Sequence, residues 1–166
     1  AYALERAKNQ GVEGIVVERK TYADRKAYSE ALAAELKSRD IDLVVLAGFM
    51  IILDESFIKA FANRIINVHP ALIPSFCGDG YYGLHVHEAA LAKGVKVSGA
   101  TVHFVNEVCD GGPIILQKAV DVVDGDTPET LQRRIMEQAE WKLLPEAVEL
   151  FCAGRLEVDG NIVHIK

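Results

Sequence analysis

The chain has 166 residues, a formal net charge of −6 and an apolar share of 50 %. This length and composition are typical of one globular domain and exclude a disordered chain. The negative charge argues against a nucleic-acid partner, which needs a basic surface, and no apolar run approaches the roughly 20 residues that cross a bilayer. Three widely spaced cysteines form no C-x-x-C pair and predict reduced thiols in a cytoplasmic protein.

The first half of the chain alternates helix and strand patterns. Residues 1–10 predict a helix that ends before Gly11, without a starting Met or an N-cap residue, so we expect the sequence to begin inside a larger domain. The run at 42–47 is continuously apolar, which predicts a strand buried in a parallel sheet. The other predicted elements are a strand at 14–17, a helix from Asp24 to Arg39, a short helix capped by Asp54 and a strand at 64–68.

The second half predicts a long loop and then strands joined by shorter turns. Residues 69–83 contain two prolines and three glycines, which is typical of a loop. Thr127-Pro128-Glu129 marks the start of a helix that runs to about Cys152, and Pro145 is expected to kink it. The remaining predictions are a helix at 84–93 stopped by Gly94, strands at 97–105 and 114–122, and a hairpin of 155–158 with 162–165 around Asp159-Gly160.

This order of elements predicts one α/β domain over residues 1–166, N-terminally incomplete, with three layers. We expect a mostly parallel central sheet with helices on both faces and a mixed edge in the C-terminal part. Ligands in such folds bind at the carboxyl ends of the strands. The segments to search for a site are therefore 48–53, 67–74 and 106–112.

The first candidate pair is Asn67 and His69, two residues apart at the end of a predicted strand. Their side chains are expected to share one face, since strand residues alternate. An amide N–H can hold a developing oxyanion, and an imidazole can move a proton near neutral pH. A pair that only caps loop backbone would give the same pattern.

The second candidate is the acidic glycine turn that begins at Asp110. Gly111 and Gly112 permit a tight turn with positive φ and a close approach of backbone to a ligand, although a plain hairpin turn would use the same residues. If the fold brings the Asp110 carboxylate to His69, the contact would raise the pKa of the imidazole and fix its orientation.

Other motifs point to no metal and no nucleotide cofactor. His85 and His87 open a predicted helix, where residues two apart point in different directions, so we expect no metal site. His103 lies within a predicted strand, either as a strand histidine or as a wall of the site. Neither NAD nor ATP is supported, because no P-loop occurs and no strand precedes the glycines Gly78, Gly80 and Gly83.

Four segments in this order resemble the folate-dependent formyltransferases, and among them the phosphoribosylglycinamide formyltransferase family. They are LAGFM at 46–50, INVHPALIP at 66–74, SGATVHFV at 98–105 and DGGPII at 110–115. The resemblance extends from Ala1 to the last helix and implies the family's Rossmann-like fold. It also implies formyl transfer from 10-formyltetrahydrofolate to the amine of phosphoribosylglycinamide, in de novo purine biosynthesis, by a cytoplasmic monomer or homodimer without a metal.

The resemblance assigns roles to matching positions. The catalytic trio would be Asn67, His69 and Asp110. Folate-binding residues would be Arg25, Met50, Ile51, Ile52, Leu53, Asn67, Asn106, Glu107, Val108, Cys109 and Asp110. Ribonucleotide-binding residues would be Glu137, Gln138, Ala139 and Glu140.

Three departures from the family pattern bear on these roles. Ile51 stands where many relatives carry a basic residue, and the loop 75–82 has extra residues that form either a lid or a neutral insertion. The family's phosphate loop, which holds an anion at a helix N-terminus, precedes the matched region, so a protein that begins at Ala1 is expected to bind the ribonucleotide weakly.

Two alternatives stay open: a 10-formyltetrahydrofolate hydrolase and an inactive folate-binding fragment. Pro70 and Gly111 favour transfer over hydrolysis, because hydrolases commonly carry a second histidine and an acidic residue there.

Overall fold

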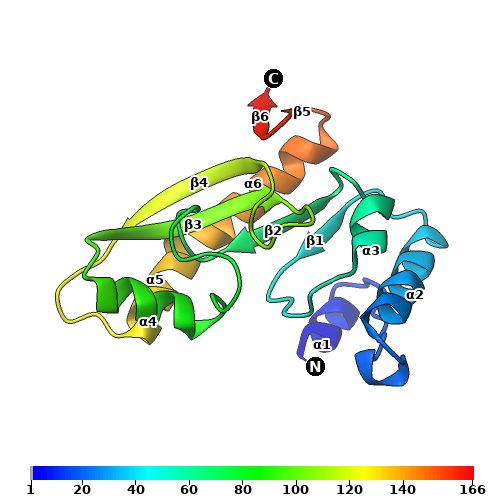
Figure 1. Cartoon of the computed structure of the whole chain (residues 1–166), viewed down its shortest axis with the longest axis horizontal. Coiled ribbons are helices and arrows are strands. Elements are labelled where there is room, and N and C mark those ends of the chain that lie inside the picture. The colour runs from blue at the N-terminus through cyan, green and yellow to red at the C-terminus, as the bar shows by residue number, and fades with distance from the viewer. Residues whose placement is uncertain (1) are drawn as a thin grey trace.

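The computed structural model describes residues 2–166, and its elements follow the predicted order closely (Figure 1). Ala1, the first residue of the predicted first helix, lies outside them. The helices are α1 (Tyr2–Asn9), α2 (Arg25–Lys37), α3 (Glu55–Ala60), α4 (Leu84–Lys93), α5 (Pro128–Ile135) and α6 (Trp141–Cys152), with a 3₁₀ turn η1 (Arg19–Thr21) and a π turn η2 (Met136–Glu140). The strands are β1 (Val44–Leu46), β2 (Ile65–His69), β3 (Val97–Phe104), β4 (Ile114–Asp121), β5 (Leu156–Asp159) and β6 (Ile162–Ile165).

The strands form one six-stranded sheet in the order β1-β2-β3-β4-β6-β5. We expected most strand pairs to be parallel, but only β1/β2 and β4/β6 are. The other three neighbouring pairs are antiparallel. The connections from β3 to β4 and from β5 to β6 are shorter than the dozen or so residues that a parallel crossover requires. The sheet is therefore mixed from β2 onward.

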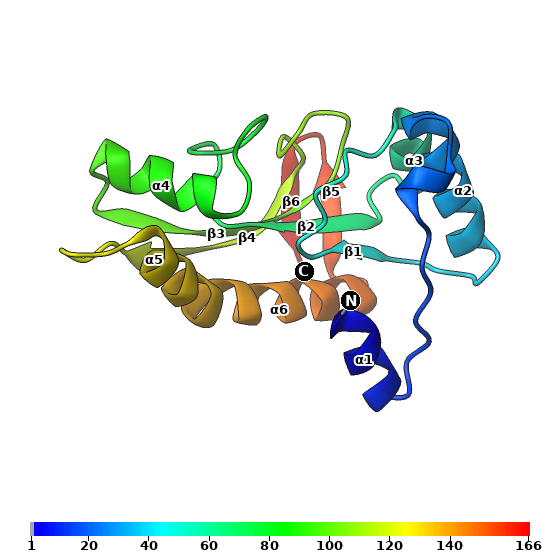
Figure 2. The same cartoon turned by 90° about the horizontal axis from the view of Figure 1, so that it is seen from below.

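Helices cover both faces of this sheet, as predicted. In Figure 2, α5 and α6 run below the sheet, whereas α2, α3 and α4 lie above it. Local caps explain where the helices begin: the Asp24 carboxylate accepts from the Ala27 N–H at 2.8 Å, and Thr127 forms a capping box with Thr130. No helix within residues 2–166 has the length and apolarity that a bilayer span requires.

Two strand predictions near the start of the chain need correction. Residues 14–17 form no strand, and the side chains of Ile15 and Val16 are 40 % and 65 % exposed. No strand of the described part of the chain pairs with this segment, so β-branched propensity alone does not make it a strand. β1 is shorter than the predicted 42–47 and is only half-buried, because it lies at the edge of the sheet.

The long C-terminal helix is interrupted earlier than expected. Its departure from α geometry is the π turn Met136–Glu140, which precedes Pro145 by more than a turn, and the chain stays helical through Pro145 to Cys152. A π turn inserts an extra residue into the hydrogen-bonding pattern and is common at functional positions. The side chains after it are therefore rotated relative to those of α5.

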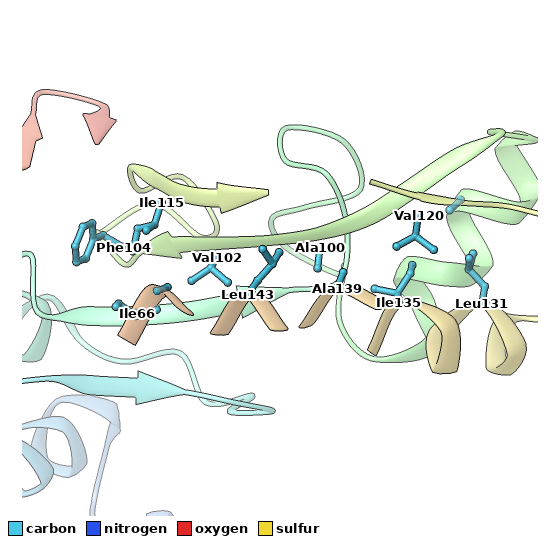
Figure 3. Close-up of a cluster of buried hydrophobic side chains, with 12 residues drawn as sticks. Ile66, Ala100, Val102, Phe104, Ile115, Val120, Leu131, Ile135, Ala139 and Leu143 are labelled. Atoms are coloured by element: carbon cyan, nitrogen blue, oxygen red, sulfur yellow. The ribbon is translucent and has the colours of Figure 1, made fainter. Parts of the chain in front are cut away.

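The main core lies between the sheet and the two C-terminal helices (Figure 3). Alternate residues of β3 face α5 and α6, so the intervening residues, Thr101 and His103, face the other side. Both of these polar side chains are buried. Core side chains with no more than 6 % exposure include Ile66, Ala100, Val102, Leu131, Ile135 and Leu143.

His87 makes the stability of the fold dependent on pH. Its side chain is fully buried on α4, and neither ring nitrogen has a hydrogen-bond partner within residues 2–166. Burial, assisted by the nearby charge of His69, lowers the pKa of His87 to about 4. In the unfolded chain this histidine binds a proton near pH 6.5, whereas in the folded protein it stays neutral down to about pH 4. The free energy of unfolding therefore decreases as pH falls from 6.5 toward 4, by about 3 kcal/mol at most.

We therefore expect the His87→Leu variant to show a flatter dependence of unfolding free energy on pH across this window. Urea unfolding between pH 7 and pH 4.5 measures it. The matched control is His85→Leu, since His85 is exposed, where it pairs with Glu88 and its ring contacts Tyr82. A wild-type slope in His87→Leu would contradict this account.

Candidate active site

β2 places an amide and an imidazole on one face of the sheet. Asn67 and His69 alternate with Ile66 and Val68, which pack toward the α5–α6 core. Asn67 is half-buried and the His69 side chain is 4 % exposed. The predicted shared face is confirmed, with Asn67 in the middle of the strand and His69 at its carboxyl end.

β3 adds a second histidine to this face. In the antiparallel pairing of β2 with β3, Asn67 lies directly opposite His103. The Asn67 Nδ2 atom is 3.3 Å from His103 Nε2. An irregularity in the β3–β4 register falls between Val102 and His103, and such bulges often redirect a side chain at a site. His103 is therefore a wall of the site.

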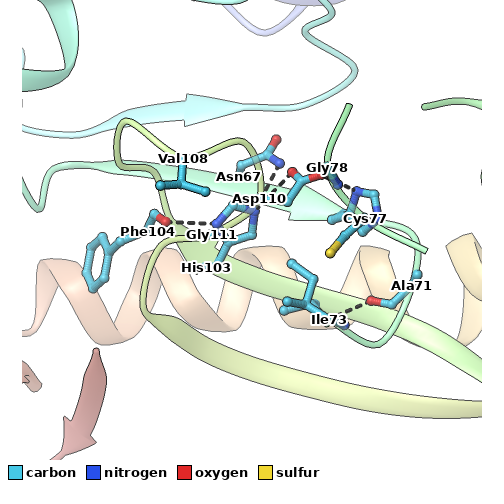
Figure 4. Close-up of polar contacts among 12 residues, drawn as sticks. Asn67, Ala71, Ile73, Cys77, Gly78, His103, Phe104, Val108, Asp110 and Gly111 are labelled. Carbon is cyan, nitrogen blue, oxygen red and sulfur yellow. Dashed lines mark hydrogen bonds and ion pairs between the residues drawn. The ribbon is translucent and has the colours of Figure 1, made fainter. Parts of the chain in front are cut away.

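Asp110 reaches the two histidines from the loop that joins β3 to β4 (Figure 4). Its Oδ2 atom is 3.4 Å from His69 Nδ1, and its Oδ1 atom is 3.7 Å from His103 Nε2. The same Oδ2 accepts a hydrogen bond of 2.9 Å from the Gly78 N–H. The Asp110 carboxylate, distant in sequence, therefore meets the Asn67–His69 pair and His103 at one point.

The loop 75–82 forms part of the site rather than a detached insertion. The carbonyl oxygen of Phe76 lies 2.8 Å from His69 Nε2, and Gly78 bonds Asp110. The base of the loop is held by Thr101, whose hydroxyl donates to Ala71 O at 2.7 Å and accepts from the Ile73 N–H at 3.1 Å. A ligand that approaches His69 Nε2 must take the place of the Phe76 carbonyl.

The pKa of His69 is set by two opposing effects. Burial lowers the pKa of His69 below its ordinary value, although Asp110 and the Phe76 carbonyl act in the opposite direction. The expected effect of Asp110 on the pKa of the imidazole is present, but desolvation of the imidazolium outweighs it. Burial raises the pKa of Asp110, but its contacts with His103 and the Gly78 N–H, together with the charge of His69, hold that pKa below its usual range.

The glycines of the turn at 110–112 are required by the packing of the backbone and not by a positive φ or a ligand. Positive φ falls on Asp110 itself, at 52°, and not on the two glycines that follow. A Cβ atom built on Gly112 would lie 1.8 Å from the carbonyl oxygen of Phe104. The close approach in this turn is thus between two backbone segments, and it fixes the loop that carries Asp110.

The candidate folate residues lie at the same edge of the sheet. Met50, Ile51 and Ile52 are exposed and Leu53 is half-buried, directly after β1. The next residue, Asp54, donates its N–H to Ser29 on α2 at 2.9 Å. Exposed Arg25, on the first turn of α2, helps to hold the pKa of Asp54 below its usual value, after the hydrogen bonds from Ser56.

The loop 106–109 is exposed at this edge except for half-buried Asn106. Asn106 accepts from the Val108 N–H at 3.0 Å, which shapes the turn. Within residues 2–166, no hydrogen bond or ion pair joins the segments 50–53 or 106–109 to Asn67, His69 or Asp110.

The candidate ribonucleotide residues coincide with the π turn. Glu137 and Gln138 are exposed, whereas Ala139 is fully buried in the apolar core and its side chain packs there. Glu140 is half-buried, and burial raises the pKa of its carboxyl. Glu140 has no side-chain ion pair within the described residues.

No group of three potential metal ligands occurs within residues 2–166. Surface hollows of about 340 and 440 Å³ lie beside η1 and along α5–η2, and neither is lined by Asn67, His69 or Asp110. The candidate site is therefore identified by its converging polar side chains and not by a hollow in the surface.

The structure is thus a three-layer α/β domain in which an amide, two imidazoles and a carboxylate meet on one face of the sheet. Residues 1–148 match the family model described as formyl transferase. The chain belongs to the formyl transferase family.

Named relatives extend over nearly the whole chain. It is 38 % identical over 165 residues to phosphoribosylglycinamide formyltransferase of Haemophilus influenzae, covering 99 % of this chain and 75 % of that protein. It is 41 % identical to the human trifunctional purine biosynthetic protein adenosine-3, of which it spans only 16 %, with 98 % of this chain covered.

Solved structures agree with the fold. Glycinamide ribonucleotide transformylase 1 of Symbiobacterium toebii superposes with a TM-score of 0.93 at 47 % identity, covering 99 % of this chain and 75 % of that one. A formyltetrahydrofolate deformylase of Pseudomonas syringae superposes with a TM-score of 0.80 at 26 % identity, covering 99 % of this chain and 53 % of that one.

Proposed function

We propose that the protein transfers a formyl group from 10-formyltetrahydrofolate to the amine of phosphoribosylglycinamide, a step of de novo purine biosynthesis. The observation that carries the proposal is the convergence of Asn67, His69 and Asp110. Two bacterial relatives, about three quarters of whose length is matched by this chain, are named phosphoribosylglycinamide formyltransferase. Their names support phosphoribosylglycinamide as the acceptor.

The reaction requires these side chains to stabilise an oxyanion, to remove one proton and to deliver another. The amine attacks the formyl carbon, and the carbonyl electron pair moves onto oxygen to give a tetrahedral intermediate. The Asn67 N–H stabilises that oxygen, a contribution typically worth 10²- to 10³-fold. A proton leaves the attacking nitrogen and one arrives at the folate nitrogen, whereupon the bond from carbon to that nitrogen breaks. Tetrahydrofolate and the formylated amine are released.

His69 is suited to both proton movements. Facing the Phe76 carbonyl, which only accepts, Nε2 must carry the hydrogen in the resting site. When substrate replaces that carbonyl, the ring changes to the tautomer that donates Nδ1–H to Asp110, and Nε2 is free to accept a proton. Because burial lowers the pKa of the resting ring and so favours its neutral form, His69 acts first as a base. Asp110 then stabilises the imidazolium that forms.

The surrounding residues supply the binding surfaces of this proposal. Arg25, the exposed apolar segment 50–53 and the loop 106–110 would hold the folate. Glu140, with Glu137 and Gln138, would contact the ribonucleotide, while Ala139 supports them from the core. We place the reaction in the cytoplasm, where the thiols of Cys77, Cys109 and Cys152 stay unpaired.

The hydrolase is the alternative that a specific observation favours, since the deformylase structure has the same fold. Both reactions need an oxyanion donor and a proton carrier, and they differ in the nucleophile. Binding of folate without turnover is the third outcome to be distinguished.

One assay separates the three. The purified protein is incubated with 10-formyltetrahydrofolate, with and without phosphoribosylglycinamide, and release of tetrahydrofolate is followed by absorbance. We expect release that depends on the amine, with the formylated product identified by mass. Release without the amine would establish the hydrolase, and folate binding measured by calorimetry without release would reject both enzymes.

A further inference from the structure

His103 is a buried titratable side chain of the site that the proposed reaction does not use. It is 1 % exposed, comes from the middle sheet strand β3 and lies opposite Asn67 in the strand pairing. Directly opposed residues of antiparallel strands contact each other on one face of the sheet. The position of His103 is therefore set by the same register that sets Asn67.

The hydrogen on the ring of His103 can be assigned from its partners. Nδ1 lies 2.8 Å from the backbone carbonyl of Phe104. A carbonyl oxygen only accepts, so Nδ1 carries the hydrogen and donates it. In the neutral ring Nε2 then has a lone pair and accepts. Its distance of 3.7 Å to Asp110 Oδ1 is too long for a hydrogen bond, which leaves Asn67 as its partner.

This assignment fixes which way the Asn67 amide faces. Its Nδ2 atom, 3.3 Å from His103 Nε2, must donate, since the reversed amide would turn an oxygen lone pair toward a nitrogen lone pair. One N–H of the amide is thus held by His103. The second N–H is left for a developing oxyanion, and the amide cannot turn its oxygen there without losing the His103 bond.

We propose that His103 is a positioning residue that orients the Asn67 amide as an oxyanion donor, through a chain from the Phe104 carbonyl to His103 to Asn67. This inference rests on the proposed function for its kinetic consequence. His103 itself does not touch the reacting atoms. Its contribution is to keep the Asn67 N–H, and not the Asn67 side-chain oxygen, facing the position where the oxyanion develops.

The kinetic test is a double-mutant cycle on formyl transfer, with Asn67→Ala, His103→Phe and the double variant. His103→Phe keeps a planar ring but removes the acceptor. We expect it to lower kcat at least tenfold with KM changed by less than about twofold, since the lost interaction belongs to the transition state. In the Asn67→Ala background the same change should cost less than about twofold, because His103 acts only through Asn67. His103→Gln, which retains an acceptor, should recover part of the loss.

A merely structural role for His103 gives a different pattern. It would lower the unfolding temperature, and the losses in kcat would multiply in the double variant. Multiplied losses, or a wild-type kcat in His103→Phe, would overturn the inference.

A second measurement separates this inference from the proposed function. In protein labelled with ¹⁵N-asparagine, the Asn67 side-chain amide is assigned by its absence in Asn67→Ala. We expect one of its two protons to exchange slowly with solvent in the wild type and rapidly in His103→Phe. If wild-type protein transfers no formyl group, the proposed function fails, and equal exchange in both proteins would then reject the positioning role on its own.

Discussion

The His69→Ala variant is expected to lose about 10²- to 10⁴-fold in formyl-transfer turnover, because it removes the only imidazole that a ligand can reach by displacing the Phe76 carbonyl. Asp110→Asn is expected to lose more than tenfold, since the neutral amide no longer stabilises the imidazolium that forms during proton transfer. Asparagine is the appropriate replacement because it tolerates the positive φ of Asp110. Steady-state rates at saturating folate measure both losses.

The matched control is His85→Ala, which removes an exposed histidine that pairs with Glu88 on α4. Its turnover should equal that of the wild type. Circular dichroism and the unfolding midpoint check that each variant keeps its fold. In a protein that transfers the formyl group, near wild-type turnover in both His69→Ala and Asp110→Asn would reject the assigned roles.

The Gly112→Ala variant is expected to lose more than about 4 kcal/mol of unfolding free energy or to fail to fold. Its Cβ atom would lie 1.8 Å from the carbonyl oxygen of Phe104, and a backbone atom at that distance has no room to move aside. Phe104 also donates its N–H to Pro113 at 2.8 Å, so the two segments are already bonded together. Denaturant unfolding followed by circular dichroism measures the loss.

Gly14→Ala serves as the control for this prediction. There the added Cβ lies 3.0 Å from the end of the Leu4 side chain, which can rotate, and in ordinary contact with the Ala7 Cβ at 3.8 Å. We expect a change within about 1 kcal/mol. A Gly112→Ala protein with the wild-type unfolding midpoint would show that the turn is far more adaptable than its packing indicates.

Local signals were sufficient for most of the fold. Asp24, Asp54 and Thr127 each accept a hydrogen bond at the start of a helix, as the capping rules predict. The segment 14–17 failed because a strand requires a neighbour, and composition carries no information about one. The direction of each strand also depends on how the connections cross the sheet, which accounts for the excess of antiparallel pairs.

The site was predictable in its parts more than in its assembly. The alternation of Asn67 and His69 follows from strand geometry alone, and their shared face is confirmed. The role of His103 depends on the register of β2 against β3, and the contacts of Phe76 and Gly78 depend on a loop with no regular pattern. The net direction of the His69 pKa could not be predicted, because its burial, unlike the neighbouring Asp110, cannot be read from a motif.

β3 contributes to both the apolar core and the candidate site. Val102 faces the core on one side of the strand, and His103 faces the site on the other. Any change of volume at Val102 therefore reaches the histidine across a single peptide unit. Efforts to make this protein more heat-resistant should leave that strand intact and modify the solvent-facing residues of β5, which is an outermost strand of the sheet and within residues 2–166 pairs only with β6.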